Sequence, residues 1–202
     1  MWVRLESNTI KEILTRPKAL TIGDINYPSN IFSMWTEAEL AVIGIVPITM
    51  DYTNRKDNLW YINTAINYAY DTETGVATGS YGTATAKALD NVLYTAQDET
   101  DGLGTEGEIK QYGLKPQKKQ DINREAGNRL SETDWMVIRE ADGGTAMPSN
   151  IKTYRAAVRT KANAMCTQID NASDVDALAA LYEYNSDDPP VRPLGEFPSE
   201  PS

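Results

Sequence analysis

One set of seven residues constrains the fold most strongly, because together they mark one face of a long helix. They recur at intervals of three and four positions over about five turns, as the buried stripe of an amphipathic helix does. The set is Ile151, Tyr154, Arg155, Val158, Ala162, Met165 and Ile169. The sequence therefore predicts that the C-terminal half is built around this helix.

Shorter helical signals flank this stripe on both sides. Pro116 suits a first helical turn, and apolar residues then repeat every four positions up to Leu130. Ser131 or Thr133 starts another helix, for which Trp135, Val137 and Ile138 form the apolar side. Ser173 and Asp174 cap a last helix, so we expect a helical region over residues 114–185.

The N-terminal residues show strand patterns. Trp2–Glu6 alternates apolar and polar side chains, Ser7 and Asn8 mark a turn, and Thr9–Leu14 can return as a second strand. Residues 18–25 are expected to add a third strand. Residues 1–50 therefore read as a small β-rich module.

A capping box predicts one short helix within that module. The hydroxyl of Thr36 and the carboxylate of Glu39 can each satisfy an amide of the first helical turn. Gly44 then ends the helix. A helix of about two turns is unstable alone, so we expect it to pack on the sheet, with Phe32 and Trp35 at the seam.

The middle of the chain gives weaker signals. Residues 60–70 alternate like one strand, residues 71–75 suit a turn, and residues 76–85 suit a return strand or a loop. Residues 86–94 are interpreted as a short helix, and the acidic, glycine-rich residues 98–108 as a mobile loop.

Together these patterns predict an α+β protein with four parts. They are the β-rich module 1–50, a mixed strand and loop segment 51–113, the helical region 114–185, and a Pro-rich acidic tail 186–202. The tail has too few apolar residues to fold alone. Leu194 and Phe197 suit docking into a groove on a neighbouring protein, and contact within the chain is the alternative.

The net charge of −10 is unevenly distributed along the chain. Residues 51–109 carry three basic and ten acidic side chains, whereas residues 110–161 carry eleven basic and six acidic ones. Overall acidity argues against nucleic-acid binding, which depends on neutralising phosphates. The basic stretch is either a solvated helix face or a surface that docks on another copy or on an acidic partner.

The residue types needed for most catalytic sites are missing. The chain has no His and only one Cys, so it lacks the commonest general base and any multi-cysteine zinc site. We expect Cys166 to be a small, half-buried residue on a helix. We therefore expect no enzyme activity, cofactor or metal.

An acidic cluster is the best candidate in the sequence for acid–base catalysis or weak calcium binding. Its spacing does not fit an EF-hand loop, and its polar setting offers no pocket to raise a pKa, so a lysin- or depolymerase-like activity is disfavoured. The cluster consists of Asp98, Glu99, Asp101, Glu106 and Glu108.

Hydropathy gives no indication of a membrane segment. No apolar run approaches the roughly 20 residues that span a bilayer, and the first residues do not resemble a signal peptide. We expect the chain to be made in a cytoplasm or carried in a particle assembled there.

Two stretches carry a resemblance to a known family. L-S-E-T-D-W at 130–135 resembles the helix start of tail fibre assembly, or tail-assembly chaperone-like, proteins of tailed bacteriophages, and 147–159 is similar to their P…Y-R-x-x-V-R continuation. Residues 27–30 and 43–45 resemble the entry module of small tail proteins of marine and cyanobacterial phages. The resemblance covers residues 1–48 and 125–170, and residues 51–120 match nothing in the family.

The resemblance implies a structural virion protein associated with the tail or fibres, located in the virion and assembled in the host cytoplasm. Its partners would be other tail, fibre or neck proteins, with several copies per particle and no nucleic acid or membrane. The alternative is a transient tail fibre assembly chaperone that leaves the particle. The N-terminal module and the tail differ from those chaperones, which favours the structural role.

Aromatic and apolar residues in distinctive positions are the expected contact residues. Tyr and Trp suit interfaces because they combine apolar area with a polar group, although half-buried packing explains them equally well. The candidates are Phe32, Trp35, Trp135, Tyr154, Leu194 and Phe197.

Overall fold

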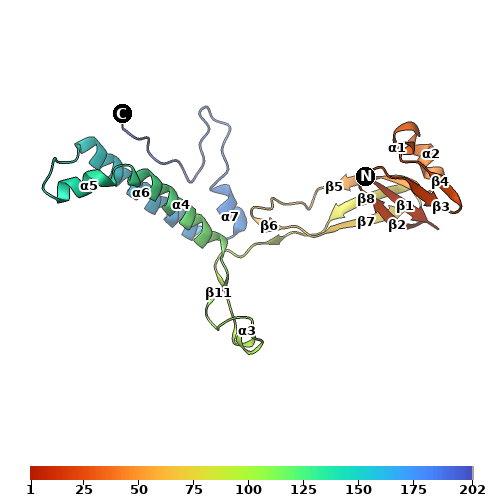
Figure 1. Ribbon diagram of the computed structural model, residues 1–202, viewed down its shortest axis with the longest axis horizontal. Helices are drawn as coiled ribbons and strands as arrows, with labels where there is room; N and C mark the ends of the chain where they lie inside the picture. The colour runs from red at the N-terminus through yellow and green to blue at the C-terminus, as the bar shows by residue number, and fades with distance from the viewer. Residues whose placement is uncertain (202) are drawn as a thin grey trace. The chain divides into compact units, whose positions relative to one another are not determined.

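A computed structural model describes residues 1–201 of the protein. The chain contains both strands and helices, and the α+β class is confirmed. It divides into two units between Thr85 and Ala86, an N-terminal unit built on a sheet and a C-terminal unit built mainly of helices (Figure 1).

The N-terminal unit is organised by a five-stranded sheet in the order β2-β1-β5-β8-β7. Its strands are β1 (Trp2–Glu6), β2 (Thr9–Leu14), β5 (Ile45–Asp51), β7 (Ile66–Asp71) and β8 (Val76–Tyr81). All neighbours run antiparallel except β5 and β8, which are parallel. The edge strands β2 and β7 also contact each other, so the sheet curls toward closure.

The two faces of this sheet have separate cores. On one face lie α1 (Ile31–Met34), α2 (Glu37–Val42) and a hairpin of β3 (Leu20–Ile22) and β4 (Ile25–Tyr27). That core is formed by Leu14, Leu20, Ile31, Leu40 and Ile45. The other core contains Val3, Val46 and Ala77, and the curl of the sheet buries it without a helix.

The β1–β2 turn and the capped helix predicted within residues 1–50 are confirmed, whereas the single strand expected over residues 18–25 forms the two short strands of the β3–β4 hairpin. Ser7 and Asn8 adopt φ angles of 51° and 60° in the β1–β2 turn. The Thr36 hydroxyl accepts a hydrogen bond from the Glu39 amide, and the Glu39 carboxylate accepts one from the Thr36 amide. Gly44 follows α2 with φ +77°.

The proposed boundary at residue 50 does not separate two parts. It falls inside β5, and β5 forms a parallel ladder with β8. The expectation of one strand over 60–70 is also wrong, because the chain forms the short β6 (Tyr61–Ile62) and then β7. The short β9 is Thr85–Ala86.

The helix expected over residues 86–94 does not form. The carbonyls of Ala88 and Leu89 instead accept hydrogen bonds from the amides of Leu114 and Lys115, which begin α4. The first amides of a helix have no partner within the helix, so they take partners from this extended segment. This pairing joins positions far apart in sequence, which local propensity cannot show.

Residues 92–111 form a small hairpin, within which residues 101–108 of the predicted loop form neither helix nor strand. β10 (Val92–Leu93) pairs antiparallel with β11 (Ile109–Gln111), and α3 (Ala96–Thr100) lies between them. A second capping box, between Thr95 and Asp98, starts α3.

Four helices follow, as the sequence predicted: α4 (Leu114–Ser131), α5 (Asp134–Ala141), α6 (Ser149–Asn171) and α7 (Val175–Ala180). α4 and α6 lie side by side (Figure 1). All members of the predicted α6 stripe are buried except Ile151, which is half-buried. The remaining residues up to 201 form neither helix nor strand.

Candidate functional site

The junction between α4 and α5 is held by one buried arginine. Arg155, on α6, is only 8% exposed. Its Nη1 donates hydrogen bonds to the Leu130 carbonyl and to Thr133 Oγ1, both at 2.6 Å, and its Nη2 donates to Asp134 Oδ1 at 2.7 Å. These bonds satisfy a carbonyl at the end of α4 and pair a charge that would be costly to bury alone.

The same bonds bring together residues of the two family-like stretches. Leu130, Thr133 and Asp134 belong to the L-x-x-T-D-W stretch, and Tyr154-Arg155 belongs to the second stretch. Nothing in the local sequence pattern indicated that Arg155 is the partner of Asp134. The stripe of α6 predicts that Arg155 is buried, and a charged residue in a buried stripe is the signal that it has a partner.

The helix that this junction positions has an exposed apolar side. None of the α5 residues is buried, and Trp135, Val137 and Ile138 are 53%, 42% and 68% exposed. The Arg139 guanidinium lies 4.8 Å from the centre of the Trp135 ring, and its Nε donates to the Thr145 carbonyl. Trp135 is therefore an exposed contact candidate that is held in place by a neighbour.

A pocket of about 370 Å³ lies beside α5. Val137 and Met147 supply its apolar part, and the charged lining residues are Glu140, Lys152, Arg155 and Arg159. Lys152 Nζ lies 2.5 Å from Glu140 Oε1, and this hydrogen bond lowers the pKa of the Glu140 carboxyl. Arg159 has no ion-pair partner within residues 1–201, so the pocket carries excess positive charge.

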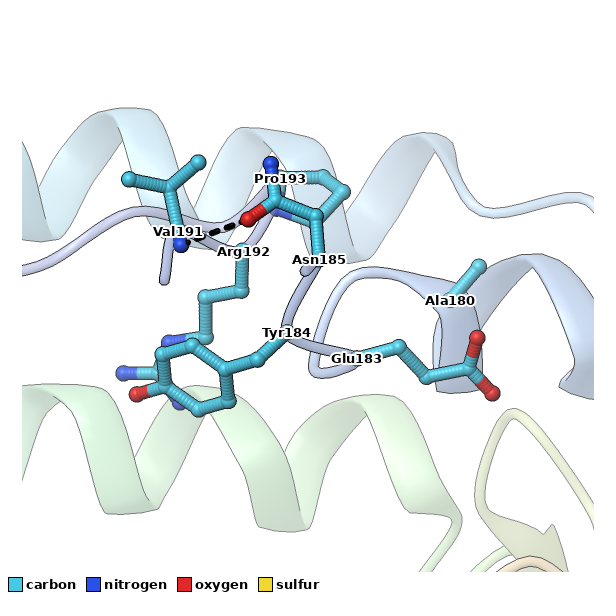
Figure 2. Close-up of a pocket in the computed structure, with 7 residues that line it drawn as sticks. All are labelled: Ala180, Glu183, Tyr184, Asn185, Val191, Arg192 and Pro193. Carbon is cyan, nitrogen blue, oxygen red and sulfur yellow. Dashed lines mark hydrogen bonds between the residues drawn. The ribbon is translucent and has the colours of Figure 1, made fainter. Parts of the chain in front are cut away.

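The Pro-rich tail packs against its own chain. Figure 2 shows where it turns back after α7, with the Val191 amide donating to Asn185 Oδ1 at 2.9 Å. The Asn185 amide donates in return to the Val191 carbonyl. The Leu194 amide then donates to the Leu181 carbonyl at 3.0 Å. These bonds fix the path of the chain between the end of α7 and Leu194.

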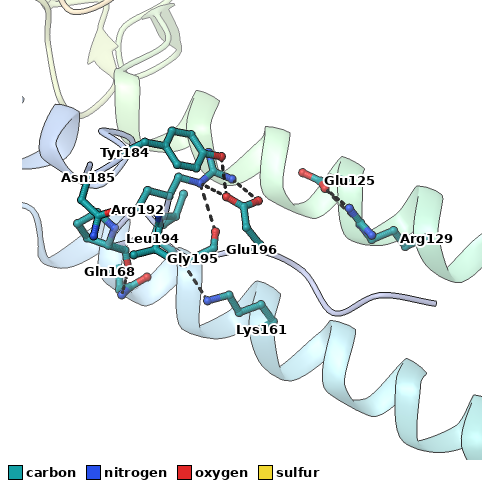
Figure 3. Close-up of polar contacts among 12 residues, drawn as sticks. Glu125, Arg129, Lys161, Gln168, Tyr184, Asn185, Arg192, Leu194, Gly195 and Glu196 are labelled. Carbon is teal, nitrogen blue, oxygen red and sulfur yellow. Dashed lines mark hydrogen bonds and ion pairs between the residues drawn. The ribbon is translucent and has the colours of Figure 1, made fainter. Parts of the chain in front are cut away.

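Long side chains of α6 hold the next part of the tail (Figure 3). Lys161 Nζ donates to the Leu194 carbonyl at 3.0 Å, and Gln168 Nε2 donates to the Pro193 carbonyl at 3.2 Å. Glu196 accepts from the Tyr184 hydroxyl and pairs with Arg192. The tail is thus tied to α6 by polar contacts at Pro193 and Leu194, and to the segment after α7 through Glu196.

Three of the six expected contact residues are used inside the C-terminal unit. Tyr154 is 6% exposed, Leu194 is fully buried, and Phe197 is 9% exposed with the Arg129 guanidinium 5.1 Å from its ring centre. The expectation that Leu194 and Phe197 meet a neighbour is therefore corrected, because in this structure both are buried against their own chain.

Phe32 and Trp35 pack on the sheet of the N-terminal unit, as expected for a seam. The Phe32 ring lies 4.7 Å from that of Trp2, and Trp35 meets Tyr27 edge to face at 5.8 Å. Both side chains are partly buried against the first core. Trp35 also lines a pocket of about 330 Å³ with Glu39, Val42 and Ile43.

The most exposed apolar residues of this unit were missed by the sequence interpretation. Val42 and Met34 are 86% and 73% exposed. Val42 lies about 200° around the helix from the buried Leu40. This helical spacing is the sequence signal that predicts an exposed Val42.

Within the acidic cluster, Asp98 is not suited to general acid catalysis. Lys110 Nζ lies 2.6 Å from Asp98 Oδ1, and the amide and hydroxyl of Thr95 donate to Asp98 Oδ2. These bonds, led by that from Lys110, lower the pKa of the Asp98 carboxyl to about 2. A carboxyl with this pKa is ionised at neutral pH and cannot donate a proton there.

Cys166 is half-buried, and burial raises the pKa of its thiol. Within residues 1–201, no three His, Cys, Asp or Glu side chains cluster in a way that could hold a metal ion. No helix in that range is long and apolar enough to cross a membrane.

Comparison with protein-family models, curated proteins and solved structures found no match for this chain.

Proposed function

We propose that this chain is a structural component of a tailed bacteriophage particle, associated with the tail or fibres, and that it acts through protein–protein contacts. The phage assignment rests on the resemblance of residues 130–135 and 147–159 to tail fibre assembly proteins. The proposed location is the virion, after assembly in the host cytoplasm, with several copies in each particle.

One observation carries the contact role. The helix α5 exposes Trp135 and Ile138, while the buried Arg155 fixes the start of the same helix to α6. A rigid element that presents apolar side chains to solvent is typical of a protein-binding surface. Because residues of both family-like stretches form this junction, the resemblance and the exposed surface concern the same part of the molecule.

The Pro-rich tail has a different place in this proposal than the sequence suggested. Leu194 and Phe197 are buried within their own chain, so we do not assign them to a neighbour. The tail supports the helices that present α5.

Quantitative mass spectrometry of purified particles tests the proposal. A structural component is expected at a fixed ratio to the other tail proteins after particles are washed. A chain found in infected cells bound to fibre subunits, but absent from purified particles, would instead establish the assembly chaperone. Retention in the particle is the property on which the two roles differ.

A variant of α5 tests the surface itself. Ile138→Asp is expected to reduce incorporation into particles, because it places a charge at the centre of the apolar surface. Leu103→Asp is the matched control, since Leu103 is 59% exposed but lies after α3. Equal incorporation of both variants would show that α5 is not the contact surface.

A further inference from the structure

We propose that copies of this chain associate head to tail, with α5 of one copy docking on the surface formed by α1 and α2 of the next copy. This inference rests on the proposed structural role and names a second copy of the chain as a partner. The docked side chain is Ile138, and the receiving site is the pocket beside Trp35.

Exposure singles out these two surfaces. Among residues 1–201, the three most exposed large apolar side chains are Val42, Met34 and Ile138. Val42 ends α2 and Met34 ends α1, whereas Ile138 lies in the middle of α5. Such side chains are costly to leave in water, and each of the two surfaces offers the other an apolar partner.

The receiving surface has a preformed hollow. Trp35, Val42 and Ile43 supply its apolar lining, and Glu39 supplies a carboxylate. Glu39 is held in place by its bonds to Thr36, and Trp35 by its contact with Tyr27. The hollow therefore requires little ordering before an apolar side chain enters it, which favours binding.

One unpaired charge beside α5 complements the acidic receiving surface. Residues 19–54 contain no Lys or Arg but four acidic residues, of which Glu37 and Glu39 lie on α2. Beside α5, Lys152 is already paired with Glu140, whereas Arg159 has no ion-pair partner within residues 1–201 and is the charge available to Glu37. Opposite charges around an apolar contact guide the approach and select the orientation.

The geometry of such a contact allows more than two copies to join. Because α5 and the α1–α2 surface are different patches, each copy keeps one free patch after pairing with another. Contacts of this type produce rings or open rows of subunits. Several copies of one chain in a particle would be arranged in this way.

Light scattering of the purified full-length chain during size-exclusion chromatography tests the inference. The average mass is expected to rise above that of one chain as the concentration increases. Ile138→Asp and Val42→Asp should each give a single-chain mass, with unchanged circular dichroism because both positions are exposed. Leu103→Asp is the control and should assemble like the unaltered chain.

Mixing the two variants distinguishes this contact from a symmetric one. The Ile138→Asp chain keeps an intact α1–α2 surface, and the Val42→Asp chain keeps an intact α5. In their mixture, α5 of the Val42→Asp chain should dock on the α1–α2 surface of the Ile138→Asp chain. The two patches that stay free in this pair carry the new Asp side chains, so the pair should not grow further. A charge exchange adds a second test, since Arg159→Glu and Glu37→Arg should each weaken association and their combination in one chain should restore it.

Three results would overturn the inference: a single-chain mass at every concentration, a Val42→Asp chain that still associates, or a mixture that does not pair. The proposed function is tested independently, because mass spectrometry of particles detects the chain whether or not its copies touch. A monomeric chain that is retained in particles would refute head-to-tail association and leave the structural role intact.

Discussion

Arg155 Nη1 donates a hydrogen bond of 2.6 Å to the hydroxyl of Thr133, although 22 positions separate the two residues. The same nitrogen donates to the carbonyl of Leu130, near the end of α4. The direction in which α5 leaves α4 therefore depends on a side chain of α6.

We expect Arg155→Lys to destabilise the helical unit by about 2 kcal/mol, because an ammonium group cannot reproduce the fork of bonds and leaves buried polar groups without partners. Urea unfolding followed by circular dichroism measures the loss. Arg159→Lys is the matched control on the same helix, and an exposed site of this kind is expected to change stability by about 0.5 kcal/mol at most. Equal effects at the two positions would contradict the role assigned to Arg155.

The tail is expected to contribute to stability through Leu194. This side chain is fully buried, so Leu194→Ala should cost about 2–5 kcal/mol, as measured for buried leucines elsewhere. Val191→Ala, at a residue that is 53% exposed, should have little effect. Urea unfolding measures the free energy of unfolding of both variants. If the tail does not pack on the helices, the two variants should have the same stability.

Two glycines with similar backbone angles are expected to respond differently to alanine. Gly23 and Gly44 have φ angles of +60° and +77°, which cost a residue with a Cβ about 1–2 kcal/mol. A Cβ at Gly44 would also lie 2.9 Å from the Leu5 carbonyl oxygen, whereas nothing lies within 4 Å at Gly23. Gly44→Ala should therefore lower the melting temperature more than Gly23→Ala, and the reverse order would refute the close approach.

The Asp98 carboxyl is expected to titrate far below its usual pKa of 3.8, with a midpoint of about 2. Because the folded state favours the charged form, its stabilising contribution is present above pH 3.8 and disappears as the pH falls toward 2. Nuclear magnetic resonance titration of the side-chain carbon measures the midpoint. Lys110→Met should raise it, while Arg124→Met, on α4, should leave it unchanged; an unshifted midpoint in the Lys110 variant would argue against the ion pair.

The sequence alone determined the elements whose signals are local. The capping box of Thr36 and Glu39 needs residues only three positions apart, and the stripe of α6 follows from helical geometry, so both were predicted and both are present. The order of strands in the sheet could not be predicted from the sequence. The parallel pairing of β5 with β8 joins strands that are separated by β6 and β7 along the chain, and no local pattern encodes it.

Only the tertiary structure decided which apolar residues face solvent. Trp135 and Leu194 were equal candidates in the sequence, since each is an apolar residue in a distinctive setting. A hydrogen bond from Lys161 of α6 and one donated by the Leu194 amide to the Leu181 carbonyl hold Leu194 against the helices, whereas Arg155 anchors α5 at its start and leaves Trp135 exposed. Burial depends on what the rest of the chain brings to a residue, and that information is spread over positions far apart in the sequence.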